Sequence, residues 1–178
     1  YSWSEAEFLH LRPNFPGFER MAAYRPDSGT LETAGGPLRL VEGMAASAEL
    51  FDVLGAGPML GRTFRAGDDA AGAEPVTVLS HALWEELGSD PSIVGKPLRL
   101  GGATRMVVGV MPRGFWFPSP ETRLWNARPL DPENRSDAPG NSVRASERVF
   151  DVLQRAGVRR ILIDNSTGGV AEDLNPWD

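Results

Sequence analysis

The sequence predicts an α+β fold in which small mixed sheets pack with short helices. Three observations support this prediction. The 178-residue chain is 41% apolar, which is enough to build a packed core as one domain or as two small subdomains. The stretch from Pro75 to Pro112 carries the signals of a strand, a capped helix and a glycine-linked hairpin. A glycine pair, Gly35-Gly36, lies between two earlier strand candidates and can form the turn of another hairpin.

A short helix is expected near the N-terminus. Ser4 and Glu7 match a capping box, and Trp3 and Phe8 occupy the two positions of a hydrophobic staple. Pro13 limits this helix to about two turns, because proline cannot donate the next hydrogen bond.

Strands and a second short helix are expected before residue 56. The predicted strands are residues 18–24, 30–33 and 38–45. Gly35-Gly36 permits a tight reversal between the last two. The helix covers residues 48–54, with Ser47 as its cap and Gly55 as its stop.

Residues 55–75 are rich in glycine and polar side chains, and they predict a long surface loop. The simplest interpretation is a compact connector that is anchored by Phe64. The glycines of this segment do not match a dinucleotide-binding fingerprint, because Gly61 stands one place late and Pro58 lies inside the motif.

The clearest local signals follow this loop. Val76–Leu79 is a short β-branched run that predicts a buried strand. Ser80 is suited to cap a helix over residues 81–87, and Gly88 is suited to its left-handed exit. Gly101-Gly102 can adopt the positive φ of a primed hairpin turn.

The strands of this hairpin are Pro97–Leu100 and Ala103–Val110. Because side chains alternate along a strand, Leu98 and Leu100 share one face of the first strand. We expect the partner strand to present Met106, Val108 and Val110 on one face, so that the hairpin lays an apolar surface on the helix.

The segment after the hairpin is aromatic, and the chain then becomes polar. Residues 114–118 and Leu124-Trp125 form an aromatic group that can cover a sheet edge or bind a partner, with burial inside the chain as the favoured interpretation. Residues 131–141 contain prolines and a glycine, and they predict a linker. Residues 142–178 form a C-terminal segment with a helix at 146–156 and a strand at 158–163.

Composition excludes several classes of protein. The net charge of −6, the pI near 5.0 and the dispersed basic residues argue against nucleic-acid binding. There is no cysteine, so disulfides and thiolate metal sites are excluded. No run approaches the roughly 20 apolar residues of a membrane span. The chain begins at Tyr1 rather than Met, which indicates a processed product or a piece of a longer protein.

No metal or cofactor site is predicted. His10 and His81 do not have the spacing of a histidine zinc site. Asp68, Asp69 and Asp90 do not have the spacing of a calcium-binding loop.

Ser80 and His81 invite a comparison with serine hydrolases, in which Asp68, Asp69 or Glu85 would orient the histidine. Neighbours in sequence rarely reach the required geometry, and Ser80 lacks the glycines of a nucleophile elbow. A helix cap is therefore the favoured interpretation of Ser80, and the hydrolase is kept as an alternative.

An ordered series of short motifs carries a family resemblance. The motifs are Ala22–Pro26, Phe51–Gly55, Leu60–Phe64, Pro75–Trp84, Asp90–Lys96, Val107–Pro112 and Gly114-Phe115. Together they resemble the MacB-like periplasmic core domain of bacterial ABC-transporter permeases. The resemblance is closest to acidobacterial-type permeases, which carry this domain beside an FtsX-like membrane domain. It covers residues 1–130 and fades from about Leu124.

The resemblance implies a βαβ-type subdomain that is interrupted near residues 46–50 by a mixed α/β subdomain. It also implies a location on the periplasmic or extracellular face of a bacterial inner membrane, as a domain of a membrane protein. Such a domain contacts substrates or a periplasmic partner protein and moves with the membrane helices. A separate cytoplasmic ATPase, reached through the membrane domain, hydrolyses ATP. No catalytic residue and no cofactor are expected here.

The predicted function is therefore that of a non-catalytic binding and motion-transmitting domain. A stand-alone secreted binding or adaptor module is the main alternative. The predicted partner surface combines the long loop with the aromatic segment, since loops on a rigid frame and clustered aromatics are common contact sites. Its residues are Arg62, Phe64, Asp68, Asp69, Phe115, Trp116 and Phe117.

Overall fold

The computed structural model describes most of the chain. The described residues are 8–9, 18–33, 36–129, 154–164 and 169–171. Their elements are β1 (Arg20–Pro26), β2 (Gly29–Glu32), β3 (Arg39–Val41), β4 (Gly43–Ala46), α2 (Leu50–Leu54), β5 (Leu60–Gly61), β6 (Val76–Leu79), α3 (His81–Glu86), the 3-10 helix η1 (Pro91–Ile93), β7 (Pro97–Leu100), β8 (Ala103–Val110), β9 (Leu124–Ala127), β10 (Arg160–Asp164) and β11 (Gly169–Ala171). Short helices and a mixed sheet confirm the predicted α+β class.

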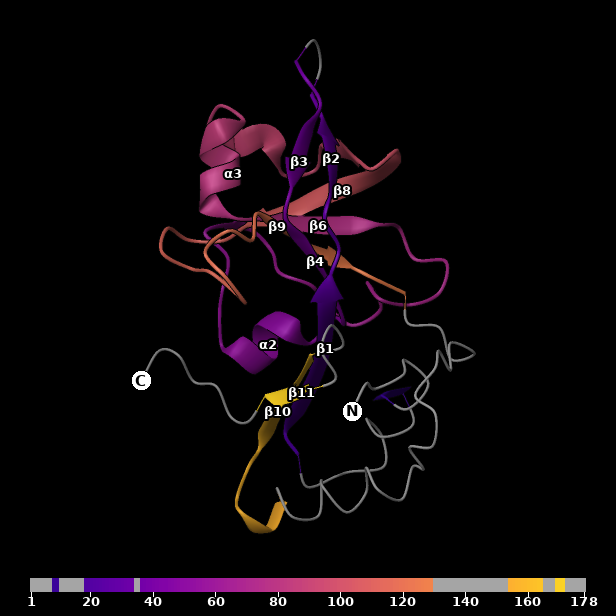
Figure 1. Cartoon of the computed structure of the whole chain (residues 1–178), viewed down its shortest axis with the longest axis vertical. Coiled ribbons are helices and arrows are strands. Elements are labelled where there is room, and N and C mark those ends of the chain that lie inside the picture. Colours follow the sequence, from indigo (N-terminus) through magenta and orange to yellow (C-terminus); the bar gives the residue numbers. More distant parts are fainter. Residues whose placement is uncertain (1–7, 10–17, 34–35, 130–153, 165–168, 172–178) are drawn as a thin grey trace.

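All of these strands join one sheet (Figure 1). Its order is β11-β10-β1-β4-β9-β6-β8-β7-β2-β3, and β5 pairs with β8 beside this path. The pairs β1–β10, β4–β9 and β6–β8 are parallel, and the remaining pairs are antiparallel. In Figure 1 the β2–β3 hairpin projects at the top of the molecule, and β10 lies toward the bottom.

Apolar side chains cover both faces of the sheet. One face packs with α2 in a core that contains Phe51, Val78 and Trp125. The opposite face packs with α3 through Leu79, Leu83 and Leu124, among others. Phe8 covers the β1–β10 end on that second face, together with Met21, Ala23, Ile161 and Ile163. Neighbours such as Val78 and Leu79 thus point to opposite cores, as strand alternation requires.

The predictions for residues 76–103 are confirmed. β6, α3, β7 and β8 occupy the expected positions. The Ser80 hydroxyl caps α3, since it accepts a hydrogen bond of 3.1 Å from the Leu83 N–H. Gly101 and Gly102 have φ of 56° and 78°, and both values are in the left-handed region that this hairpin turn requires.

The strands predicted before residue 46 are also present, with shifted limits. β1 covers 20–26 rather than 18–24, and β2 and β3 pair as the expected hairpin. The single strand predicted at 38–45 is divided into β3 and β4 at Glu42. The reason is that β3 pairs with β2 at one end of the sheet, whereas β4 pairs with β1 and β9 nearer the other end.

The predicted role of Ser47 is wrong. α2 begins at Leu50, and the Ser47 hydroxyl instead accepts a hydrogen bond of 3.1 Å from the Ala23 N–H of β1. Ser47 is fully buried next to β1, where an unpaired backbone N–H would be costly. The predicted stop is confirmed, because Gly55 ends α2 in the left-handed conformation.

The predicted common face of Met106, Val108 and Val110 is also wrong. Met106 and Val108 pack in the α2 core, whereas Val107 and Val110 pack in the α3 core. The register between β6 and β8 shifts at Thr77/Val78, so that an extra residue of β8 reverses the alternation. Leu98 and Leu100 do share the α3 face, as predicted.

Three strands were not predicted. The residues after the strand at 158–163 were expected to be irregular, but β11 forms there and pairs with β10. β5 lies inside the segment that was expected to be loop, and it has only two residues. β9 occupies a central place between β4 and β6, although Leu124–Ala127 has no alternating pattern. Its four residues are buried because both faces of the sheet are covered there.

Near the termini, β10 confirms the strand predicted at 158–163. Other predictions fall largely outside the described residues: most of the helix from Ser4 to Pro13, the linker at 131–141 and most of the helix at 146–156.

Candidate functional site

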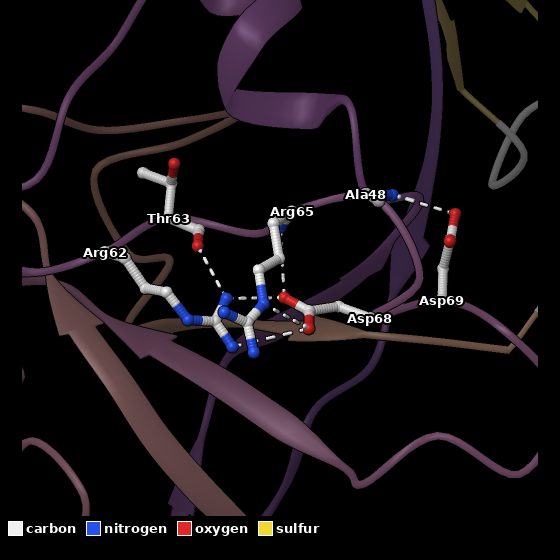
Figure 2. A network of polar contacts seen from close by, with 6 residues as sticks. All are labelled: Ala48, Arg62, Thr63, Arg65, Asp68 and Asp69. Carbon is white, nitrogen blue, oxygen red and sulfur yellow. Dashed lines mark hydrogen bonds and ion pairs between the residues drawn. The ribbon is translucent and has the colours of Figure 1, made fainter.

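The candidate site is built on the loop that follows β5. Asp68 lies at its centre and its side chain is only 10% exposed (Figure 2). Its carboxylate accepts hydrogen bonds from the Arg62 guanidinium at 2.6 and 3.3 Å and from the Arg65 N–H at 3.0 Å. A two-point contact between a guanidinium and a carboxylate fixes orientation as well as distance. Asp68 therefore holds residues 62–68 in one turn.

Asp69 ties this turn to the rest of the frame. Its carboxylate accepts a hydrogen bond of 2.9 Å from the Ala48 N–H, just before α2 (Figure 2). Arg62 also donates a hydrogen bond of 2.9 Å to the Thr63 carbonyl. The two aspartates thus have separate roles, since one closes the loop and the other attaches it.

Phe64 points into the protein. It is 5% exposed and lies edge-on to Phe51 of α2, with a ring separation of 5.2 Å. It therefore anchors the loop through the core, as the simplest interpretation of the sequence predicted.

The aromatic segment meets the same helix. Phe115 is partly buried, and its ring lies 6.1 Å from that of Phe51 and 5.3 Å from that of Trp125. Phe117 is buried against Tyr24, at a ring separation of 4.9 Å. The structure thus brings the loop and the aromatic segment together around Phe51.

Trp116 differs from its two neighbours because it is 47% exposed. Of the predicted surface residues, Phe64 and Phe117 are buried and Phe115 is partly covered, so they support the surface from below. Trp116 is the large apolar side chain of this set that is accessible to a partner.

Ser80 and His81 line a hollow of about 180 Å³ that Phe115 of the aromatic segment also lines. Its other residues include Glu85, Arg113, Thr122 and Arg123. His81 Nδ1 lies 3.4 Å from Glu85 Oε2. Within the described part of the chain, however, no hydrogen bond joins Ser80 to His81, and the Ser80 hydroxyl is occupied at the helix N-terminus. This geometry supports the helix cap rather than the hydrolase.

Ser80→Ala is expected to lower the free energy of unfolding by about 1 kcal/mol, because the Leu83 N–H loses its partner. Chemical denaturation measures this change. Ser28→Ala, at an exposed serine, is the control and should stay within about 0.5 kcal/mol of the parent. An unchanged stability for Ser80→Ala would contradict the capping role.

Asp90 caps η1 rather than joining the other two aspartates in a calcium-type loop. It accepts hydrogen bonds from the side chain and N–H of Ser92 and from Lys96, which lower its pKa to about 2.

Among residues 8–9, 18–33, 36–129, 154–164 and 169–171, His, Asp and Glu do not gather in threes that could hold a metal ion. Over the same residues, each helix is too short or too polar to cross a membrane.

Comparisons with known proteins identify one family and two solved structures with a similar fold. The family model for MacB-like periplasmic core domains matches residues 1–146. The extracellular domain of the noncanonic ABC-type transporter YknZ from Gram-positive bacteria is 21% identical, with a TM-score of 0.57 over 71% of this chain. The periplasmic region of MacB from Actinobacillus actinomycetemcomitans is 16% identical, with a TM-score of 0.51 over 78% of this chain. This chain spans 63% and 67% of those two domains, respectively. No curated protein matches it in sequence.

Proposed function

This chain belongs to the family of MacB-like periplasmic core domains, and we propose that it binds a partner protein or a substrate outside the cytoplasm and transmits conformational change to the membrane part of an ABC-type permease. The observation that carries the proposal is the family match over residues 1–146, which includes the strands from β1 to β9. The two solved structures share this fold.

The same family relation supports a non-catalytic role. In the proposed assembly, a separate cytoplasmic ATPase hydrolyses ATP, and the membrane part connects that ATPase to this domain. Two features of the chain fit a mechanical role. The sheet is continuous from β11 to β3, and the candidate surface is attached to it through Phe64 and the Asp69–Ala48 hydrogen bond.

The proposed partner surface is centred on Trp116 and includes the loop that holds Arg62, Asp68 and Asp69. A large aromatic ring that is half exposed on a rigid support loses little conformational entropy on binding, and tryptophan is enriched among the residues that dominate binding energy. Phe64, Phe115 and Phe117 hold this surface from within.

Trp116→Ala in the full-length permease is expected to weaken partner or substrate binding by about tenfold or more, and to lower transport accordingly. A photo-crosslinking amino acid at position 116, in intact cells, gives a direct readout of the contact. Leu40 is the matched control, because it is also a large exposed apolar residue, at 75%, and it lies on the edge strand β3 rather than in the aromatic segment. Equal crosslinking at positions 116 and 40, with full transport by Trp116→Ala, would remove this surface from the proposal.

The wider proposal has its own test. Replacing the domain by a flexible linker in the permease–ATPase complex should abolish transport and leave the ATPase assembled. Transport that persists without the domain would overturn the motion-transmitting role.

A further inference from the structure

The hollow lined by Ser80 and His81 lies at the carboxyl ends of two parallel strands. β6 and β8 run in parallel, and α3 follows β6 directly. Ser80 comes immediately after β6 and Arg113 comes shortly after β8, and both line the hollow. In α/β sheets, ligands bind in the crevice outside the carboxyl ends of the strands. The hollow therefore has the position of a binding site in the fold.

One buried side chain of the hollow has no partner. Thr122 is 2% exposed, and its hydroxyl has no hydrogen-bond partner in the part of the chain that the structure describes. A buried hydroxyl without a partner lowers stability, so its presence calls for a physical reason. Because Thr122 lines the hollow, a hydrogen-bond acceptor bound there would satisfy this hydroxyl.

The backbone around Thr122 is held in place by hydrogen bonds. The Thr122 N–H donates 3.1 Å to the Ser119 carbonyl, and the Arg123 N–H donates 2.8 Å to the Glu42 carbonyl. The Arg123 carbonyl accepts 2.8 Å from the Ser80 N–H at the end of β6. This wall of the hollow is thus formed before a ligand binds, which lowers the entropic cost of binding.

The charged side chains of the hollow carry an excess of positive charge. Among the described residues that line it, Arg113 and Arg123 are cationic and Glu85 is anionic. Arg113 donates a hydrogen bond to Glu85, and Arg123 lies 3.7 Å from Glu86, which is outside the lining. Each contact uses one guanidinium nitrogen, whereas arginine has five N–H donors. Both arginines therefore keep donors for a further acceptor.

Size and charge limit the ligand. The volume of about 180 Å³ is about six times that of one water in the liquid, and it is below the roughly 300–1,000 Å³ of pockets for whole small molecules. The hollow thus holds a small chemical group. A monoanion balances the single excess positive charge, whereas a dianion exceeds it beside Glu85. We propose that the hollow is a binding site for a carboxylate group, which accepts hydrogen bonds from the Thr122 hydroxyl and from an arginine.

The carboxylate belongs either to a free small acid or to an acidic side chain of a partner protein. Phe115 lines the hollow and is followed by Trp116, which is the centre of the partner surface proposed above. An acidic residue of a partner on that surface would have the hollow beside it. The carboxylate site does not rest on the proposed function, because it is tested in the 178-residue chain alone.

The main experiment follows backbone amide shifts of this chain by NMR while sodium acetate is added at constant ionic strength. Saturable shifts are expected at residues that line the hollow, and sodium sulfate should bind several-fold more weakly. Two capped peptides that differ only in a central Asp or Asn distinguish the sources. Tighter binding of the Asp peptide than of acetate assigns the site to a partner side chain, and equal or weaker binding assigns it to a free acid.

Thr122→Val separates a binding role from a structural one. It removes the hydroxyl, so the acetate affinity should fall about tenfold, the change expected for one hydrogen bond to a charged group. The urea midpoint should stay the same or rise, because the lost hydroxyl had no partner among the described residues. A Thr122→Val chain that binds acetate as tightly as the parent would overturn the proposal.

Arg113→Met tests the charge of the hollow. It removes the excess positive charge, so the acetate affinity should fall. Arg159→Met is the matched control, because Arg159 is 72% exposed against 75% for Arg113, pairs with a glutamate and does not line the hollow. This control should bind acetate like the parent. Equal losses in both variants, equal affinities for acetate and sulfate, or no saturable shift with acetate or the Asp peptide would each exclude the carboxylate site.

Discussion

Trp125→Ala is expected to lower the free energy of unfolding by about 3–5 kcal/mol, among the largest effects of any single substitution in the chain. Trp125 lies in the central strand β9 and is completely buried. Its ring contacts Phe51 at 5.7 Å and Phe115 at 5.3 Å, both edge-on. Its Nε1–H donates a hydrogen bond of 3.0 Å to the Phe117 carbonyl. Alanine would leave a cavity and an unpaired buried carbonyl.

Urea denaturation followed by circular dichroism measures this loss. Trp125→Phe separates the two causes, since it keeps most of the ring volume but removes the donor, and we expect a smaller loss of about 1–3 kcal/mol. Trp116→Ala is the control for the residue type, because that tryptophan is half exposed, and it should change stability by no more than about 0.5 kcal/mol. Equal losses for positions 125 and 116 would show that the aromatic core does not carry the stability assigned to it.

The elements that the sequence predicted well are those whose signals are local. Ser80 caps α3 from three residues away, and Gly101-Gly102 turns the β7–β8 hairpin within its own loop. Such contacts depend on neighbours along the chain, so residue types and spacing are sufficient to predict them. The same stretch, Pro75–Pro112, also carries several of the motifs on which the family resemblance depends. The fold class and the family could therefore both be predicted from the sequence.

The features that sequence did not predict depend on distant partners. β9 is a strand because β4 and β6 lie on either side of it, and its own residues show no alternation. The Ser47 hydroxyl bonds to Ala23, which is 24 positions away, although its local sequence is that of a helix cap. The bulge in β8 is set by its pairing with β6 and by the two cores that it separates.

The candidate site was predictable as a region but not in its details. Loop composition and aromatic content drew attention to two segments, and the fold brings these segments together around Phe51. Which side chains point outward is a tertiary property. Phe115, Trp116 and Phe117 are consecutive and similar in type, yet one is half exposed while the next is buried against Tyr24. The separate roles of Asp68 and Asp69 also follow only from the positions of Arg62 and Ala48.

A chain that ends at residue 146, where the family match ends, is expected not to fold cooperatively. The described residues beyond that point include β10, which pairs in parallel with β1 from Arg20↔Arg160 to Tyr24↔Asp164. Ile161 and Ile163 pack with Phe8 and Met21 on one face, and Leu162 packs in the α2 core on the other. Burying a side chain of this size stabilises a protein by about 1.5–3 kcal/mol, so these three contribute about 4.5–9 kcal/mol. That range is comparable with the whole stability of a typical domain, about 5–15 kcal/mol.

Far-UV circular dichroism and the dispersion of amide resonances distinguish a folded chain from an unfolded one after truncation. Ile163→Ala tests the same contacts in the full chain, with an expected loss of about 2–5 kcal/mol, because this side chain is completely buried. Arg159→Ala is its matched control on the same segment. Arg159 is 72% exposed and forms a surface ion pair with Glu19, so we expect a loss of less than about 1 kcal/mol. A truncated chain with the cooperative unfolding of the parent would mean that β1 and β4 are stable without β10, and that the sheet does not need its C-terminal strands.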